Sequence, residues 1–149
     1  MTMTKDKPAE APKPVTPRAR KMAQKTSLAA EPTYVQGRRT FFKYRDLGVT
    51  QASDGLMRAQ VIKAITGMTS PTGWHYHVCQ GQFVYVTKGW LDLEFADGTK
   101  CHMGPGDSCY IPGGMPHNET ATSDDVELIE MSVPAEMGTV ALDGPTAKA

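Results

Sequence analysis

Short stretches of alternating apolar and polar residues make up most of the chain after about residue 38. The clearest is 90–95, where Leu91, Leu93 and Phe95 fall on one face of a strand and Asp92 and Glu94 on the other. An Asp-Gly pair follows after one further residue and is typical of a tight hairpin turn. No stretch of this part of the chain repeats its apolar positions with a helical period. The pattern therefore predicts many short strands and no long helix.

The same alternation, punctuated by Gly, Pro, Asp and Ser, predicts nine strands. They span residues 39–45, 56–66, 74–78, 82–87, 90–95, 99–103, 107–111, 115–119 and 126–132. On 56–66, Arg58 and Gln60 share one face and Ala59 and Val61 the other, and the pattern does not decide which face is inside. Many short strands at regular spacing favour an all-β sandwich or closed barrel.

Length and cysteine content limit the class of protein. The 149 residues are enough for one domain with a core of its own. Three Cys residues without regular spacing do not suggest a disulfide framework. No apolar run approaches the roughly 20 residues of a membrane span, and the first residues lack the apolar stretch of a secretory signal. We therefore expect a cytoplasmic protein with no membrane partner.

The formal net charge of zero is a balance between two unlike parts of the chain. Residues 1–32 carry seven basic and three acidic side chains, five of the eleven Pro residues and no aromatic residue. Such a segment buries too little apolar surface to offset the entropy of ordering. We expect a disordered or loosely docked arm over 1–35, a barrel over 36–134 and a C-terminal tail over 135–149. An alternative for the arm is contact with a second subunit or an anionic surface; its charge is too weak to predict a nucleic-acid partner.

The four His residues are the main candidates for chemistry. His75 and His77 lie two positions apart on a predicted strand, so their imidazoles share a face and could clamp a metal ion. His117 follows 40 residues after His77 and joins the pair only if the fold returns the chain to the same place. His102 lies on another predicted strand. His pairs with this spacing also occur as ordinary surface or core residues, so spacing alone leaves the metal site open.

Two segments resemble the two motifs of the cupin superfamily. Residues 73–89 contain the His75-x-His77 pair. Four residues then separate His77 from Gln82, and six separate Gln82 from Gly89. Residues 106–117 read Gly, five residues, Pro, one residue, Gly, two residues, His117. The resemblance covers about residues 40–132 and implies a double-stranded β-helix, or jelly-roll barrel. It also implies one divalent metal ion on His75, His77 and His117, with Fe(II) favoured and Mn, Ni, Zn or Co as alternatives.

Two positions depart from the motifs. The Glu of the first motif is Gln82 here, and the Asn that often ends the second motif is Ala121. Gln82 would offer a neutral carbonyl oxygen, so three His residues and Gln82 would leave the ion with a formal charge of +2. Such a site favours a substrate that is anionic or can be enolised. We expect Gln82 to be a ligand, with a hydrogen-bonding role beside the ligands or a purely structural role as the alternatives.

Two charged residues are candidates for catalysis. Glu119 shares a face with His117 if its strand runs straight, and would then serve as a general acid or base. The alternative is a solvated carboxylate near a strand end. Arg58 is a candidate anchor for an anionic substrate if its face of 56–66 lines the barrel. His102 matches no motif position and is left without a role.

The resemblance implies a metal-dependent protein that takes a small molecule, and we expect an oxygenase. One alternative is a lyase or isomerase that uses the ion as a Lewis acid. The other is a non-catalytic protein that only binds its small molecule. The resemblance also implies a homodimer, and we expect no nucleic-acid partner.

Overall fold

The computed structural model describes residues 19–146 and confirms the predicted all-β jelly-roll fold. One sheet has six strands in the order β1 (Thr33–Val35), β2 (Phe42–Asp46), β3 (Arg58–Ala64), β10 (Glu127–Val133), β5 (Gly81–Lys88) and β8 (Ser108–Pro112). The other has five in the order β11 (Gly138–Ala141), β4 (His75–Val78), β9 (His117–Thr122), β6 (Leu91–Phe95) and β7 (Lys100–Met103). All the paired strands are antiparallel.

The apolar faces of the two sheets pack against each other and form the core. Leu91, Leu93 and Phe95 on β6 are buried, as their alternation predicted. Val84 and Val86 on β5 are buried from the opposite sheet. Because both sheets contribute to one apolar cluster, the strands that carry the polar residues described below are held in fixed positions.

Each of the nine predicted strand regions overlaps an observed strand, although several strands extend beyond the predicted bounds. The single helix among the described residues, α1 (Val49–Ala52), is one turn long, in keeping with the lack of a helical period. No helix of residues 19–146 is long and apolar enough to cross a membrane.

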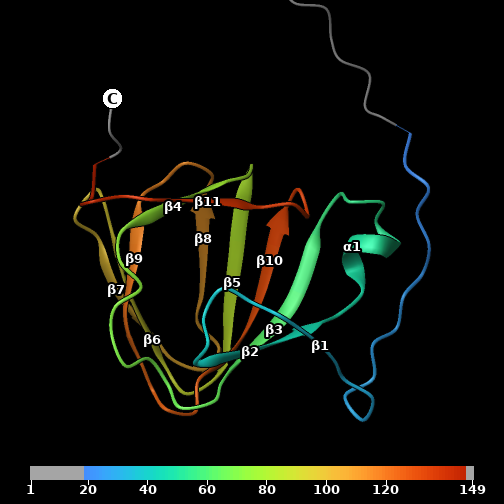
Figure 1. The fold of residues 1–149 in the computed structure, drawn as a ribbon, viewed down its shortest axis with the longest axis horizontal. Coiled ribbons are helices and arrows are strands. Elements are labelled where there is room, and N and C mark those ends of the chain that lie inside the picture. The colour runs from blue at the N-terminus through green and yellow to red at the C-terminus, as the bar shows by residue number, and fades with distance from the viewer. Residues whose placement is uncertain (1–18, 147–149) are drawn as a thin grey trace, which may run out of the picture.

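Two further strands lie where the sequence predicted an arm and a tail. β1 falls within residues 1–35 and pairs with β2, and β11 falls within residues 135–149 and pairs with all four residues of β4. The residues of both strands are largely exposed, so neither has the alternation that burial imposes. They are held by backbone pairing at a sheet edge, which leaves little pattern in the sequence. In Figure 1, β11 and β4 run across one end of the barrel.

The described part of the predicted arm is docked on the barrel. The backbone N–H of Ala23 donates to the carbonyl of Ala52 at 2.8 Å, and Arg45 donates to the Ser27 hydroxyl at 3.0 Å. Arg20 donates to the carbonyl of Asp54 at 2.7 Å. This part of the chain therefore lies beside α1 and β2 (Figure 1). Residues 1–18 of the predicted arm lie outside the described residues.

Candidate metal centre and its cavity

Three His side chains meet inside the barrel because of strand register. His75 on β4 pairs directly with His117 on β9, which sets their ring centroids 4.4 Å apart. His77 shares the inward face of β4 with His75, and their ring centroids are 5.1 Å apart. One ligand atom from each residue lies within 4.8 Å of the others, and all three side chains are buried. The three residues that the sequence singled out are therefore together and could hold a metal ion.

Hydrogen bonds fix which ring nitrogen of each His residue faces the cluster. Nδ1 of His75 donates to the carbonyl of Gly73 at 2.8 Å, and Nδ1 of His117 donates to the carbonyl of Met115 at 2.9 Å. Nδ1 of His77 lies 2.9 Å from the hydroxyl oxygen of Thr139 on β11. Because a carbonyl oxygen only accepts, the proton of His75 and of His117 is on Nδ1, and Nε2 keeps its lone pair for a metal.

Burial favours the neutral form of His75 and His77, which is the form that a metal requires. Burial lowers the pKa of His75 below its usual value, and burial together with His117 and His75 lowers the pKa of His77 to about 4. Nε2 of His117 is buried and has no hydrogen-bond partner among the described residues. An unpaired, buried nitrogen beside two further imidazoles fits a divalent cation.

Gln82 lies in the same cavity, on the inward face of β5. Its side chain is 4% exposed, and its Nε2 donates to Oε2 of Glu130 at 2.7 Å. Its Oε1 is buried and has no partner among the described residues. That unpaired carbonyl oxygen is the atom that a metal would use, so the arrangement is compatible with a fourth ligand. The role of Gln82 stays a prediction.

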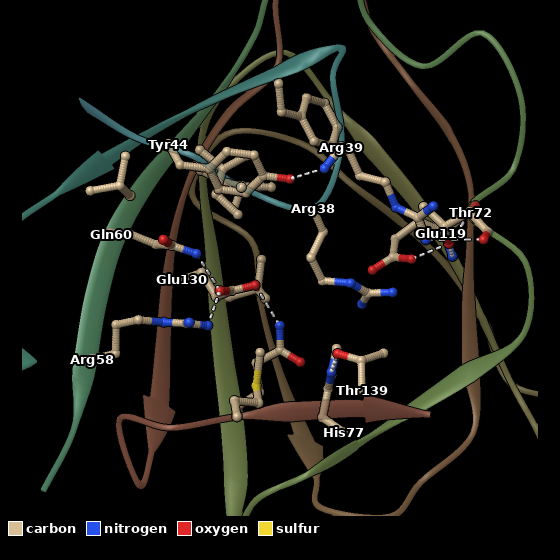
Figure 2. Close-up of a pocket in the computed structure, with 18 of the residues that line it drawn as sticks. Arg38, Arg39, Tyr44, Arg58, Gln60, Thr72, His77, Glu119, Glu130 and Thr139 are labelled. Carbon is tan, nitrogen blue, oxygen red and sulfur yellow. Dashed lines mark hydrogen bonds and ion pairs between the residues drawn. The ribbon is translucent and has the colours of Figure 1, made fainter. Parts of the chain in front are cut away.

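The cavity has a volume of about 610 Å³ and is lined by both sheets. Arg58, Gln60 and Ile62 all contribute to its wall, which decides the question of which face of β3 is inside. Arg58 donates to Oε1 of Glu130 at 3.2 Å, so its charge already has a partner. Figure 2 shows Arg38 extending into the cavity between Glu119 and Glu130. Burial and the neighbouring Arg39 lower the pKa of Arg38, and a guanidinium still remains charged at neutral pH.

Glu119 also faces the cavity, on the same side of β9 as His117. Its Oε2 lies 3.7 Å from Nε2 of His75. The irregularity in the pairing of β6 with β9 comes after Glu119, so the strand keeps its alternation from His117 to Glu119. The Thr72 hydroxyl donates to the carboxylate and accepts the backbone N–H of Glu119 at 3.1 Å. Burial raises the pKa of Glu119, but His75 and the Thr72 hydrogen bond outweigh this effect, and the pKa lies below its usual value.

The sequence missed several residues that complete this site. Glu130 alternates with Val126 and Leu128 on a predicted strand, but Ile129 and Met131 make the other face apolar as well, so the pattern did not select the inner face. Thr139 and Arg38 lie outside the predicted strands, and no feature of the sequence marked them as residues of the site. His102 is exposed on β7, where its Nδ1 contacts Asp92 away from the cavity.

Comparison with known proteins agrees with this architecture. The profile of the Cupin domain family matches residues 66–133, which include both motifs. No curated protein sequence matches the chain. Among solved structures, KdgF from Halomonas sp. is 21% identical with a TM-score of 0.63, and the match covers 76% of this chain and 96% of that one.

Two further structures are similar in fold. The polyketide cyclase RemF from Streptomyces resistomycificus is 18% identical with a TM-score of 0.63, over 83% of this chain and 89% of that one. The oxalate decarboxylase from Bacillus subtilis is 16% identical with a TM-score of 0.62, over 81% of this chain and 32% of that one. At these identities the likeness shows the fold alone. Residues 66–133 of this chain thus match the Cupin domain family, and the barrel as a whole has the fold of these structures.

Proposed function

We propose that this protein is a metal-dependent enzyme that transfers a proton to or from a small anionic substrate. The observation that carries the proposal is the Glu119 carboxylate, which lies 3.7 Å from His75 Nε2 in the same cavity. Its pKa lies below the usual carboxyl value, so Glu119 is ionised at neutral pH, and its carboxylate oxygens can accept a proton from an acidic C–H group held beside them. The two hydrogen bonds with Thr72 hold it in place.

The residues that would hold the metal ion are His75, His77 and His117, with Gln82 as the fourth ligand. When bound, a divalent ion supplies positive charge that stabilises negative charge developing on the substrate. All four donors are neutral, so the protein ligands do not offset that charge. This donor set supports an anionic substrate. The identity of the ion stays the sequence prediction: Fe(II), with Mn, Ni, Zn or Co as alternatives.

Arg38 is a stronger candidate than Arg58 for the anchor of the anionic group. The guanidinium of Arg58 is engaged with Glu130, whereas Arg38 extends into the open part of the cavity (Figure 2). A cavity of about 610 Å³ suits a molecule of metabolite size. We therefore assign the anchoring role predicted for Arg58 to Arg38.

Two classes of reaction are compatible with these residues. Lyase, isomerase or cyclase chemistry is our first candidate, because a base beside a Lewis acid is what such reactions need. Two of the structural relatives, the polyketide cyclase and the oxalate decarboxylase, carry names of non-oxygenase activities. The oxygenase expected from the sequence is the second candidate and is supported by the neutral donor set. A homodimeric state and a cytoplasmic location also stay proposals.

The test is proton exchange in deuterated water, followed by NMR on small 2-oxo acids and 1,3-dicarbonyl compounds. We expect the metal-loaded protein to exchange an acidic C–H proton, and Glu119→Gln to slow this by about 10²–10⁴-fold with unchanged metal content. Oxygen uptake with the same compounds would favour the oxygenase. Binding of these compounds without exchange, turnover or oxygen uptake would contradict the proposal and favour the non-catalytic alternative.

A further inference from the structure

Glu130 on β10 accepts hydrogen bonds from three side chains in the cavity wall (Figure 2). Its Oε1 accepts from Arg58 at 3.2 Å and from Gln60 at 2.7 Å. Its Oε2 accepts from Nε2 of Gln82 at 2.7 Å. Because an ionised carboxylate has acceptors only, each amide that faces it must present its NH₂ group. The orientation of the Gln82 amide therefore follows from the chemistry of Glu130.

This contact determines which atom of Gln82 remains available. With Nε2 committed to Glu130, the carbonyl Oε1 is left buried and without a partner among residues 19–146. Gln82 lines the same cavity as His75 and His77. A buried acceptor without a partner is costly, and a cation held by the His cluster would satisfy it.

We propose that Glu130 is a positioning residue for the metal centre, and that it holds Gln82 with its carbonyl oxygen available to the ion. The inference rests on the metal site of the proposed function. Glu130 also places a negative charge directly behind the neutral Gln82 amide. The carboxylate that the first cupin motif carries at position 82 thus lies one hydrogen bond further away here, on β10, and the donor that Gln82 offers to the ion stays neutral.

The substitution Glu130→Gln tests this orientation with almost no change of shape. If the carbonyl oxygen of the new amide keeps the hydrogen bonds from Arg58 and Gln60, its NH₂ group takes the place of the carboxylate Oε2. That NH₂ group faces Gln82, which must then turn its own carbonyl oxygen toward position 130. The NH₂ group of Gln82 would point the other way, and an amide NH₂ is no metal ligand.

A charge swap supplies the rescue. In Gln82→Glu combined with Glu130→Gln, the NH₂ group at position 130 donates to the carboxylate at position 82. The other carboxylate oxygen is free for the metal, and the total charge equals that of the natural protein. We expect this double variant to bind metal at least as tightly as the natural protein.

The experiment is a titration of the full chain with Co²⁺, followed by its visible absorption spectrum and by calorimetry. We expect Glu130→Gln to weaken Co²⁺ binding by about 10–100-fold. Gln82→Ala should weaken binding and change the spectrum, because it removes the ligand itself. Glu127→Gln is the matched control, since Glu127 lies on the same strand but contacts Lys63 at 3.7 Å and Thr87 at the surface. Thermal unfolding of the metal-free forms separates loss of folding from loss of metal.

Each outcome bears on a different part of the argument. Natural protein that binds no Co²⁺ would overturn the metal site and the proposed function with it. If the natural protein binds Co²⁺, and Gln82→Ala or Glu130→Gln binds it with the same affinity and the same spectrum, only the inference about Glu130 is overturned. A double variant as weak as Glu130→Gln would also overturn it, because the loss would then not reflect the amide orientation. If Glu130→Gln does not fold, the Co²⁺ affinities of Gln82→Ala and of the double variant still test the inference.

Discussion

The hydrogen bond between Thr139 and His77 connects the C-terminal strand β11 to the candidate metal centre, and it can be removed with little change of shape. Thr139→Val replaces the hydroxyl by a methyl group and keeps the β-branched side chain that suits a strand. The Thr139 hydroxyl lies 2.9 Å from Nδ1 of His77, and His77 is only 6% exposed. Among residues 19–146, the Thr139 hydroxyl is the one hydrogen-bond partner of this Nδ1, so the variant leaves the Nδ1–H without it.

The expected magnitude follows from the cost of a buried, unpaired donor, which is about 1–3 kcal/mol. With a metal on Nε2, the proton of His77 must be on Nδ1, so the metal-bound form bears this cost in full. Without metal, the proton can move to Nε2, which faces the cavity, and the cost is smaller. We therefore expect Thr139→Val to weaken metal binding by about 10–100-fold, the range found when partners of ligand His residues are removed.

The assay is competition for Zn²⁺ or Co²⁺ with a chelator of known affinity, alongside thermal unfolding of the metal-free protein. Thr139→Ser keeps the hydroxyl and is the control; it should bind metal within about threefold of the natural protein. The reasoning is refuted if Thr139→Val binds as tightly as the natural protein, or if Thr139→Ser loses as much affinity as Thr139→Val.

Three further predictions concern the cavity, the buried His cluster and the core. Arg38→Met should raise the KM or Kd for anionic compounds by about 10-fold or more, with metal content unchanged, whereas neutral analogues should be affected little. Because the pKa of His77 falls from about 6.5 in the unfolded chain to about 4 in the folded one, the unfolded state binds more protons between these values. The metal-free protein should therefore lose stability as the pH falls from 6.5 to 4, by at most about 3 kcal/mol from this residue, and His77→Gln should flatten that part of a denaturant-unfolding profile. Leu93→Ala, at a core position that is 3% exposed, should lower the free energy of unfolding by about 2–5 kcal/mol; a loss below about 1 kcal/mol would contradict the assigned core.

The alternation of apolar and polar residues predicted those strands of the protein that have one buried face. Leu91, Leu93 and Phe95 alternate because one face of β6 meets the opposite sheet, and that periodicity can be read from the sequence. The spacing of His75 and His77 predicts a shared face for the same reason. His117 could be joined to them only through the motif resemblance, since its contact with His75 depends on the pairing of β4 with β9.

The residues around the His cluster were harder to predict because nothing local marks them. Thr139 lies on β11, an edge strand with little burial, and it reaches His77 only through the pairing of β11 with β4. Arg38 lies on a connection between β1 and β2, where side-chain direction follows no period. Glu130 does alternate with buried residues, but the other face of its strand carries Ile129 and Met131, so the pattern did not identify the inner face.

The two carboxylates of the cavity are held in different ways, and this separates their tasks. Glu130 accepts three side-chain donors, among them the Arg58 guanidinium, and each of these contacts would weaken if it took up a proton. Among the described residues, Glu119 accepts from one side chain, the Thr72 hydroxyl, and a hydroxyl can also accept, so a change in the protonation of Glu119 disturbs fewer contacts of the cavity wall. Two carboxylates in one site take separate roles when their environments differ in this way. Positioning therefore belongs to Glu130, and proton transfer in the proposed reaction belongs to Glu119.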